Sequence, residues 1–545
     1  MGRNWIRKHG LIIKATLFAL LPLAACLVTC ARQGYSIREV YLPASPWNDE
    51  LFYFKQVEGI VKFGYPYGYF GFNESHAQFL SFAAWSPVLV LPWVLFGKLL
   101  GWGLLSPVIY NILFLSLALF FFVILAKPGY QQVGILTFLF LLFTRFPRYM
   151  LSGMPEVLCF SLLILFFGLE LRYLEERKKW NLVLLFAVSF LLTLMRPYFL
   201  VFLLLPCYFL SRSVWLRVPA DPKEPVRNRA GAFRPAGLRK WAGLLAGAAI
   251  LGAAGAGYGA VKHFLGAEYF TPLFDTTWIS AFLRQGFGEG IRYMASRLFH
   301  GGAQFLKITV EGLQSGAPTG AYFAGFLAVL ALLLGYTAAE IRRKQKKEAL
   351  VYGHLAFCFV GMLAALLLMY KMEEGSKHLQ TFIVVGIFAV SGMETRFYKK
   401  AVFLGVLFAY LYTFKAVSAY EYQVPFVSLR QEEILAYWEG AFAEHMTLER
   451  EDAPSFSNTV IWTFADTIGT ETTGTRQAMD WQILYALPEG FGISCCTDFY
   501  LLQQFDGLKS RYLAAPAGGT VDAMCTGAGF TEVGRLGTVV VYKRY

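Results

Sequence analysis

Residues 78–100 read Q-F-L-S-F-A-A-W-S-P-V-L-V-L-P-W-V-L-F-G-K-L-L. This stretch is apolar enough to span a membrane, and whether it does so decides on which side of the membrane every later loop lies. Pro87 and Pro92 divide it into short pieces, as expected of helices that lie along a membrane surface or against other protein. The positions of the basic residues in the rest of the chain distinguish the two topologies.

The composition is that of a chain that crosses a membrane several times. Of its 545 residues, 56% are hydrophobic, 17% are aromatic and only 16% are charged, and soluble domains are less apolar than this. The net charge of +13 would suit a nucleic-acid partner, but the Lys and Arg residues occur in short clusters between apolar runs. That pattern is typical of cytoplasmic loops, so we expect no nucleic acid.

Apolar runs that suit transmembrane helices occur at about eleven places outside 78–100. They lie near residues 11–30, 104–126, 131–147, 154–173, 181–195, 198–211, 241–261, 319–339, 349–370, 379–393 and 400–418.

The basic clusters indicate that 78–100 does not cross. Arg3, Arg7 and Lys8 place the N-terminus inside. With 78–100 on the surface, the loops after every second span are cytoplasmic, and they contain all the basic clusters. If 78–100 crosses, nearly all of these clusters lie outside. The clusters are at residues 127, 172–179, 212–240, 342–347 and 396–400.

The predicted fold is therefore an α-helical polytopic membrane protein with a small extracytoplasmic α/β domain. Residues 1–418 form the membrane module, with outer loops at 31–103 and 262–318 and a basic cytoplasmic loop at 212–240. The tail, 419–545, is less hydrophobic and contains short strand patterns such as T-V-V-V-Y at 538–542. The sequence shows no internal repeat, P-loop or dinucleotide-binding fingerprint.

The eight cysteines show no metal-binding spacing. In the tail, Cys525 could pair with Cys495 or Cys496, and the sequence does not choose between them. The segment L-A-A-C at 23–26 resembles a lipidation site, but the apolar run continues to Cys30. We interpret it as part of an uncleaved membrane anchor, with lipidation as the alternative.

Adjacent carboxylates follow the first apolar run, in A-S-P-W-N-D-E-L-F-Y-F at 44–54. Asp49 or Glu50 could act as a general base at the membrane surface. The alternative is that both are solvated acids at the start of a helix. Farther on, Glu156 lies where the third span leaves the membrane and the fourth begins. An acid there needs water, a cation or a basic partner, and Arg145 and Arg148 are close in sequence.

Basic residues are expected at the same outer face. Arg196 precedes Pro197 in a turn between two apolar spans, and Lys377 and His378 lie in the turn M-E-E-G-S-K-H-L-Q at 372–380. Converging cations suit a ligand that carries a phosphate. Snorkelling of each side chain to the membrane interface is the alternative.

The sequence resembles the GT-C glycosyltransferases, and within them the bacterial glycosyltransferase 39-like group of protein O-mannosyltransferases and aminoarabinose transferases. The resemblance covers residues 10–420. It is strongest in W-N-D-E-L-F-Y at 47–53, in G-Y-P-Y-G-Y-F-G-F-N-E-S-H-A at 64–77 and in W-S-P at 85–87. It implies a first outer loop that carries the catalytic acid, followed by helices lying along the membrane.

The resemblance also implies roles for individual residues. Asp49 corresponds to the catalytic acid, with Glu50 beside it, and Glu156 corresponds to a second acid that is more usually Asp. Arg196 corresponds to a basic residue followed by Pro. The remaining correspondences are looser: Lys377 and His378 stand where the family binds the lipid phosphate, and Glu74 and His76 stand where many relatives have a Pro-rich or His-Pro element.

The implied activity is transfer of a hexose or pentose from a polyprenyl-phosphate donor, with inversion, at the outer face of a bacterial cytoplasmic membrane. The acceptor could be a glycan, a lipid or a protein. Some relatives use a divalent metal near the acids, but no His or Cys set in this sequence argues for one. The expected localisation is multi-pass, with the N-terminus inside and the tail outside.

Three other functions fit parts of the sequence. A transporter or flippase of lipid-linked sugars would place polar residues at mid-membrane and often shows repeats, whereas most acids here lie at the expected membrane edges. A receptor or scaffold that displays the tail leaves the outer acids and bases without a shared purpose. A polymerase or ligase of surface polysaccharide belongs to a neighbouring class of enzyme.

Overall fold

The structure is a computed structural model that describes most of the chain. The described residues are 2–32, 34, 36–38, 49–64, 73–74, 87–142, 149–215, 236–265, 277–315, 318–370, 372–393, 431–447, 456–462, 465–466, 477–478, 481–496 and 498–544.

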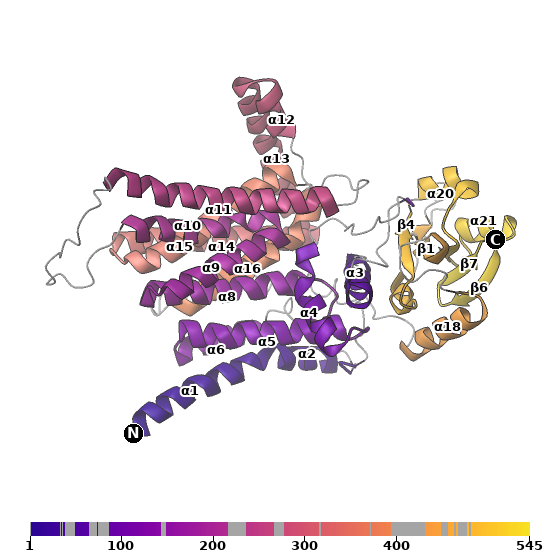
Figure 1. Ribbon diagram of the computed structural model, residues 1–545, viewed down its shortest axis with the longest axis horizontal. Helices are drawn as coiled ribbons and strands as arrows, with labels where there is room; N and C mark the ends of the chain where they lie inside the picture. Colours follow the sequence, from indigo (N-terminus) through magenta and orange to yellow (C-terminus); the bar gives the residue numbers. More distant parts are fainter. Residues whose placement is uncertain are drawn as a thin grey trace.

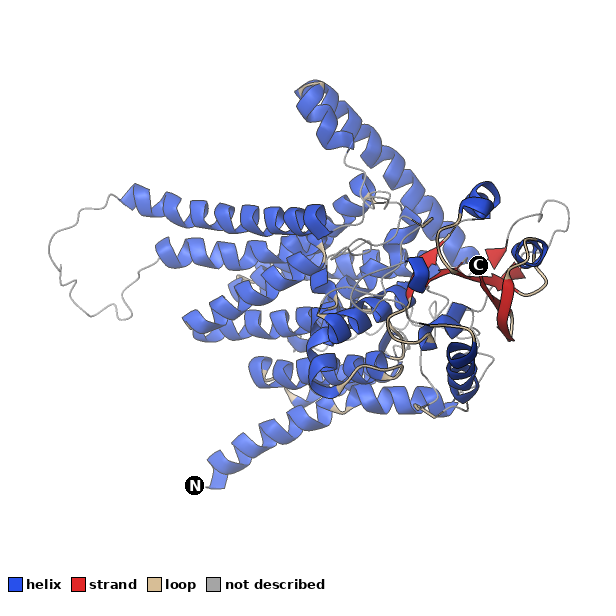
Figure 2. Ribbon diagram, turned by 45° about the vertical axis from the view of Figure 1, so that its right-hand side comes forward, coloured by secondary structure: helices blue, strands red, loops and turns tan. Residues whose placement is uncertain are grey.

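Helices form a bundle at one end of the molecule, and a small sheet lies at the other end (Figures 1 and 2). The helices before residue 394 are α1 (Gly2–Ala19), α2 (Leu21–Arg32), α3 (Asp49–Phe63), η1 (Pro87–Leu89), α4 (Leu91–Leu100), α5 (Ser106–Ala126), α6 (Tyr130–Leu142), α8 (Glu156–Glu176), α9 (Lys179–Met195), η2 (Pro197–Phe199), α10 (Leu200–Trp215), α11 (Ala236–Leu265), α12 (Thr277–Arg284), α13 (Phe287–Ser315), α14 (Pro318–Arg342), α15 (Lys346–Met369) and α16 (Met372–Met393).

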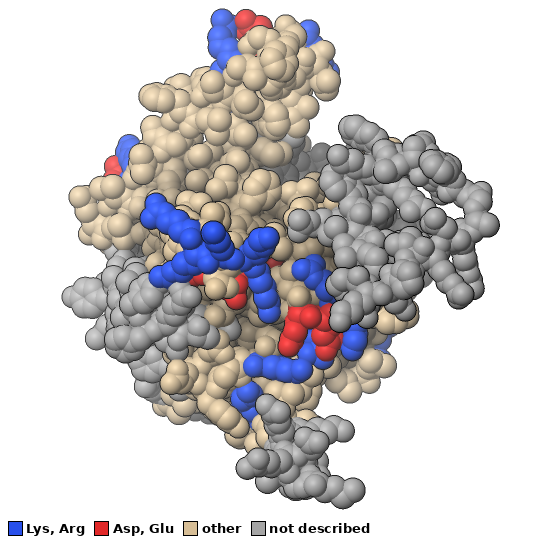
Figure 3. Space-filling view, turned by 90° about the vertical axis from the view of Figure 1, so that its left-hand side faces the viewer, with Lys and Arg blue, Asp and Glu red and all other residues tan. Residues whose placement is uncertain are grey.

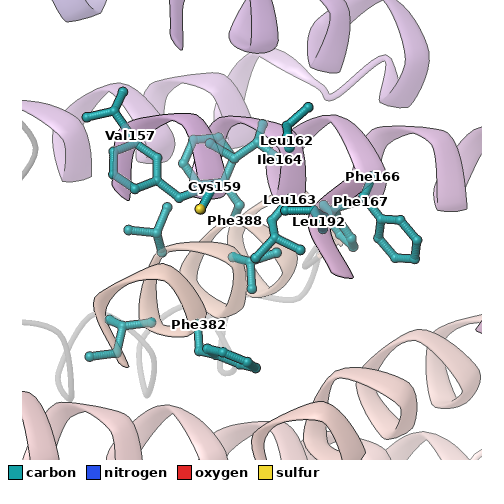
Figure 4. Packing of buried hydrophobic residues seen from close by; sticks show 14 of the residues in the cluster. Val157, Cys159, Leu162, Leu163, Ile164, Phe166, Phe167, Leu192, Phe382 and Phe388 are labelled. Atoms are coloured by element: carbon teal, nitrogen blue, oxygen red, sulfur yellow. The ribbon is translucent and has the colours of Figure 1, made fainter. Parts of the chain in front are cut away.

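The central helix of the bundle is α8, which packs against α5, α9 and α16. Its residues 156–164 are buried without interruption, so it has no face turned to solvent or lipid in that stretch. Figure 4 shows Leu163 of α8 near Leu192 of α9 and Phe388 of α16. This all-round burial fixes the position of the first residue of α8, Glu156.

In the described part of the chain, six helices are long and apolar enough to cross a membrane by length and composition: 10–31, 106–126, 156–176, 244–261, 322–342 and 346–369. Shorter apolar helices lie at 91–100, 179–195, 197–211 and 378–391. Helices therefore occupy the predicted spans wherever these are described; residues 143–147 and 400–418 fall outside the described part. The predicted fold class, a polytopic helical membrane protein with a small C-terminal α/β domain, is confirmed.

In its described part, the stretch that decides the topology forms a 3-10 turn and one short helix. Of 78–100, residues 78–86 lie outside the described part; the remainder forms η1 and α4. Since α4 has 10 residues, it is about 15 Å long, half the thickness of the hydrocarbon layer. Pro92 stands in its first turn, where a proline is tolerated. α4 lies at the edge of the bundle nearest the sheet (Figure 1).

The C-terminal domain, here called the C-domain, comprises the described residues from 431 onward. Its five-stranded sheet has the order β4-β1-β5-β7-β6, with β1 parallel to β4 and β5, and β7 antiparallel to β5 and β6. The predicted strand at 538–542 is confirmed as β7. The elements are α18 (Gln431–Glu444), η3 (Phe456–Asn458), β1 (Thr459–Trp462), β2 (Ala465–Asp466), β3 (Gln477–Ala478), η4 (Trp481–Ala486), β4 (Gly492–Cys495), α20 (Asp498–Gln504), η5 (Phe505–Gly507), β5 (Tyr512–Pro516), α21 (Thr520–Gly527), β6 (Thr531–Leu536) and β7 (Val539–Lys543).

The sheet of the C-domain is covered on both faces. Trp462 of β1 joins one core with Trp438 of α18, and the adjacent Ile461 joins the other with Leu501 of α20 and Val521 of α21. This alternation follows from the two-residue period of a strand. The helices α20 and α21 lie on the side of the sheet away from the bundle (Figure 1).

All eight cysteines lie in the described residues and are free. Burial raises the pKa of both Cys496 and Cys525 to about 12. These thiols are therefore protonated at neutral pH and chemically inert. Neither of the disulfides that the sequence left open is formed.

The described parts of the basic loops lie at the end of the bundle opposite the C-domain. Figure 3 views that end, where Lys and Arg side chains gather with a few carboxylates among them. Arg172 pairs there with Glu176, and Arg343 with Glu340 at 3.4 Å. The predicted basic loop 212–240 lies partly in the ends of α10 and α11; its residues 216–235 are outside the described part.

The predicted loop 262–318 contains two helices, α12 and α13, joined at Gly286, whose φ is +95°. α12 and the start of α13 project from the side of the bundle (Figure 1), and α13 then packs on α14 and α15. Leu283, Phe287 and Phe299 are each at least 75% exposed. Such an apolar surface on a membrane protein suits contact with lipid.

Candidate functional site

Arg196 lies at a break between two helices. α9 ends at Met195, and Arg196 has extended backbone angles of φ −148° and ψ 125°, which the following Pro197 favours by excluding the helical region. A single 3-10 turn, η2, then leads into α10. The break directs the Arg196 side chain into the protein, where it is 0% exposed.

Glu156 lies at the first position of α8, directly after Pro155. A carboxylate there is stabilised by the partial positive charge of the helix N-terminus. Like Arg196, Glu156 is 0% exposed. The nearby Arg145 and Arg148 lie outside the described residues; the partner that the structure gives Glu156 is a more distant cation.

Glu156, Arg196 and His378 come together from three helical segments, and we call them the buried charge cluster. Arg196 Nη2 donates to Glu156 Oε1 at 2.7 Å. Arg196 Nη1 contacts His378 Nδ1, which lies 3.9 Å from the same carboxylate oxygen. The sequence singled out all three residues separately, and the structure brings them into one contact.

Two tyrosines complete the surroundings of the cluster. Tyr198 OH accepts a hydrogen bond from Arg196 Nη1 at 2.9 Å. The ring centroids of Tyr198 and Tyr370 lie 5.7 and 5.5 Å from that of His378. Sequence analysis missed both tyrosines. The only signal was the position of Tyr198 two residues after Arg196, which is weak in a chain with 30 tyrosines.

The carboxylate of Glu156 is engaged on one side only. Its Oε1 contacts Arg196 and His378, while Oε2 is buried without a hydrogen-bond partner among the described residues. A buried, unpaired carboxylate oxygen is energetically unfavourable. The cluster can therefore accept a further donor, such as a hydroxyl or amine group of a substrate.

α3 carries the acids of the first outer loop, and it brings Glu50 close to this cluster. Glu50 is buried, and its Oε2 accepts a hydrogen bond from the Gly153 amide at 3.1 Å. Gly153 is three residues before Glu156 in the sequence. Tyr53, also on α3, interacts electrostatically with Arg196. Asp49 is the first residue of α3, but its side chain lies outside the described part.

A polar network holds the turn between Tyr149 and Glu156. Trp93 Nε1 of α4 donates to Asn111 Oδ1 of α5 at 3.1 Å, and Asn111 Nδ2 donates to the Ser152 carbonyl at 2.9 Å. Sequence analysis did not single out Asn111, although one amide in an apolar span is unusual. The network explains why α4 stays at this end of the bundle: its indole anchors the turn that precedes Glu156.

The remaining predicted residues lie elsewhere or outside the described part. His76 is not described, and Lys377 belongs to α16 but its side chain is not described. Glu74 is described, and its hydrogen bonds to other described residues are with the C-domain. Its carboxylate accepts hydrogen bonds from the amides of Lys509 and Ser510 and from the hydroxyl of Tyr500. A substrate-binding role for Glu74 stays a prediction, and the structure gives its carboxylate a place in the contact between the first loop and the C-domain.

Among the described residues, no group of three or more His, Cys, Asp and Glu side chains is arranged to hold a metal ion. Because the side chains of Asp49 and His76 are not among them, a divalent metal near the acids stays a question for experiment.

No protein-family model and no curated protein sequence matches this chain. Among solved structures, it is similar to the archaeal oligosaccharyltransferase AglB from Archaeoglobus fulgidus in complex with an inhibitory peptide and a dolichol-phosphate, with a TM-score of 0.46 and 13% identity over 94% of this chain and 70% of that one. It is also similar to ArnT from Cupriavidus metallidurans, in the apo state and bound to undecaprenyl phosphate.

The two ArnT structures have TM-scores of 0.40 and 0.41 and identities of 10% and 11%, and they cover 96% and 99% of this chain and 97% and 98% of ArnT. At these identities the chemistry of the chain has to be derived from its own side chains.

Proposed function

We propose that the protein is a membrane glycosyltransferase that transfers a sugar from a polyprenyl-phosphate donor to an acceptor. The observation that carries the proposal is the buried charge cluster of Glu156, Arg196 and His378. It lies at the same end of the bundle as α3, which begins with Asp49 and Glu50. The acids at the start of α3 and the cations of the buried charge cluster thus lie at the same end of the bundle. Transfer from a phosphate leaving group requires both kinds of group.

In this mechanism Asp49 is the general base that deprotonates the acceptor nucleophile. The nucleophile attacks the anomeric carbon, the bond from that carbon to the phosphate oxygen breaks, and the configuration inverts. Arg196 stabilises the charge on the departing polyprenyl phosphate, because its planar fork can share donors between carboxylate and phosphate oxygens. Lys377, one residue before His378, adds a second positive charge.

The orientation belongs to the same proposal. Lys and Arg residues gather at the end of the bundle opposite the C-domain, and cytoplasmic loops carry such an excess. We place that end in the cytoplasm of a bacterial cell and the C-domain and active site outside the cytoplasmic membrane, where the acceptor is a component of the cell envelope.

The first experiment measures sugar release from radiolabelled polyprenyl-phosphate donors by the purified protein in liposomes. We expect turnover by the wild type, loss of at least 100-fold in Asp49→Asn with donor binding retained, and weaker donor binding in Arg196→Gln. A parallel reaction with EDTA decides whether a divalent metal takes part. Equal turnover by wild type and Asp49→Asn would remove Asp49 from the chemistry.

One feature favours the transporter alternative: an ionisable pair deep inside the bundle. Glu170 of α8 lies 3.7 Å from His354 of α15, measured from Oε1 to Nδ1, and both side chains are almost fully buried. Neither carboxylate oxygen has a hydrogen-bond partner among the described residues. Glu170 is 14 residues after Glu156, about 21 Å along the helix. Buried intramembrane acids often mark ion pathways.

The two functions predict different results for the double variant Glu170→Leu/His354→Leu. Replacing a buried pair by apolar residues is often neutral or stabilising, and in a glycosyltransferase this pair is remote from the chemistry, so turnover should change less than threefold. In a transporter the same variant should abolish solute or lipid movement across liposomes. Transport by the wild type, lost in this variant and without sugar release, would replace the proposed function.

A further inference from the structure

α3 lies between the helix bundle and the C-domain (Figure 1) and is buried against both. The Phe52 ring is 6.2 Å from that of Trp462, and the Phe54 ring is 5.5 Å from that of Tyr485. Other apolar side chains of α3 belong to the core of the bundle. The residues in the C-domain core are Leu51, Phe52 and Phe54, and those in the bundle core are Tyr53, Val57 and Ile60.

Lys55 fixes α3 to the C-domain. Its side chain is 1% exposed, and Nζ donates to the Leu487 carbonyl of the C-domain at 2.9 Å and to Glu58 Oε2 at 2.8 Å. A charge that is so completely removed from water is tolerated only when it has hydrogen-bonding or ionic partners. One of these partners belongs to the C-domain, so α3 cannot keep this arrangement without it.

Glu74 makes the second attachment of the first loop. Its carboxylate accepts from the Ser510 amide at 2.6 Å and from the Lys509 amide at 2.9 Å. The preceding Asn73 donates its amide to the Cys495 carbonyl at 2.8 Å, at the edge strand β4. Burial, and then the charge of Glu74, raise the pKa of Tyr500 to about 12, so its hydroxyl remains a donor to Glu74.

The backbone of this attachment is strained. Asn73 and Glu74 have φ values of +53° and +55°, and each such residue costs about 1 kcal/mol or more. Strain of this kind persists only where the surroundings enforce it. Here the enforcing contacts are the C-domain amides that hold Glu74.

At its other end α3 reaches the active site. Glu50, five residues before Lys55, accepts from the Gly153 amide in the turn that leads to Glu156. A continuous path of contacts therefore joins the Leu487 carbonyl, Lys55, α3, Glu50 and the turn before Glu156.

We propose that Lys55 and Glu74 are positioning residues through which the C-domain holds α3, and with it the acids at 49–50, against the buried charge cluster. The inference rests on the proposed function for its kinetic consequence, but the physical linkage stands on the contacts alone. The C-domain is then a part of the active-site scaffold, whatever else it binds.

The test compares Lys55→Met with Lys62→Met. Both lysines lie on α3 and face the C-domain, but Lys62 pairs with Glu489 at 3.1 Å in an exposed position, with the two side chains 32% and 55% exposed. We expect Lys55→Met to lower kcat for sugar release 10-fold to 100-fold with donor KM within twofold, because small displacements of a general base are costly. Lys62→Met should stay within twofold, and Glu74→Gln should follow Lys55→Met.

Hydrogen exchange of the same variants gives a readout that needs no turnover. In Lys55→Met and Glu74→Gln, amide exchange should accelerate at least tenfold in residues 50–63 and in the turn 149–155, and not in α14 or α15. Faster exchange confined to the C-domain would overturn the linkage. Faster exchange in α3 with an unchanged kcat would overturn the positioning role of Lys55 and Glu74 and leave the linkage standing. A wild type without turnover rejects the proposed function, while exchange still decides the linkage. If Lys55→Met does not fold, Glu74→Gln carries the test.

Discussion

Arg196 and Glu156 form an ion pair in which both side chains are 0% exposed. Taking either charge out of water is expensive, and the pair offsets this through their mutual attraction and the contacts with Tyr198 and His378. Replacing one partner leaves the other charge buried and unpaired. Replacing both partners leaves no unpaired charge. Stability and activity should therefore respond differently to single and double substitutions.

We predict that Arg196→Gln and Glu156→Gln each lower the free energy of unfolding by about 3–5 kcal/mol. The double variant should lose less than the sum of the two, because it contains no unpaired charge. Donor turnover should fall at least 100-fold in Arg196→Gln and stay low in the double variant. Thermal unfolding in detergent and sugar-release assays on the four proteins measure both effects.

A double variant that regains turnover together with stability would contradict the catalytic part of this prediction. It would show that the pair serves the fold alone. Ser296→Ala, on the exposed part of α13, is a matched control that should change neither property.

At the residue scale, the sequence indicates the charged side chains of the candidate site more clearly than the uncharged groups that form hydrogen bonds around them. Arg196, Glu156 and His378 stand out because ionisable residues at the ends of apolar spans are rare. Tyr198 and Asn111 carry no such signal, since a tyrosine or an amide fits many environments. Their roles depend on the break after Met195 and on the turn before Glu156, which are tertiary features.

At the scale of elements, close helix packing depends on glycines that the apolar pattern does not reveal. A Cβ at Gly320 of α14 would lie 2.6 Å from the Cα of Gly312 in α13. Because the nearest atoms all belong to the backbone of Gly312 and Leu313, no side-chain rotation can relieve this contact. Small residues at such positions allow helices in membranes to approach.

We predict that Gly320→Ala forces α13 and α14 apart and lowers the free energy of unfolding by roughly 1–3 kcal/mol. Gly252→Ala is the matched control, because a Cβ at Gly252 in α11 has no atom within 4 Å. Alanine there should be neutral or slightly stabilising, since it is the better helix former. Thermal unfolding of both variants in the same detergent gives the comparison, and equal behaviour would contradict it.

The spans were predictable as elements because about 20 consecutive apolar residues leave few alternatives in a membrane. α12 and α13 were predicted only as a loop, since their charged residues interrupt the apolar pattern. The burial of α3 on two sides was not predictable either. Its sequence, D-E-L-F-Y-F-K-Q-V-E-G-I-V-K-F, mixes polar and apolar residues on all faces, and only the C-domain explains why Lys55 is buried.

At the scale of the whole molecule, the C-domain and the bundle share α3 and form one folding unit. Burying Leu51, Phe52 and Phe54 in the core that α3 forms with the C-domain and Trp102 contributes roughly 4.5–9 kcal/mol, at about 1.5–3 kcal/mol for each side chain. That is comparable to the total stability of a typical domain. We therefore expect the two parts to stay together without the covalent link through 394–430.

We predict that the two parts stay associated after the chain is cut between them. A protease site inserted near residue 425 allows cleavage of the purified protein, and the C-domain should co-elute with the bundle in size-exclusion chromatography. Truncation at residue 430 should instead give an aggregated protein, because it exposes the apolar face of α3 and leaves Lys55 without the Leu487 carbonyl.

The decisive experiment compares the cleaved wild-type protein with the cleaved Lys55→Met and Glu74→Gln variants. Both variants weaken the attachment, so the C-domain should elute separately at micromolar concentration, whereas cut Lys62→Met should remain intact because its ion pair is exposed and screened by solvent. Separation of the cut wild type would show that the interface is weak, and that the C-domain depends on its linker to reach α3.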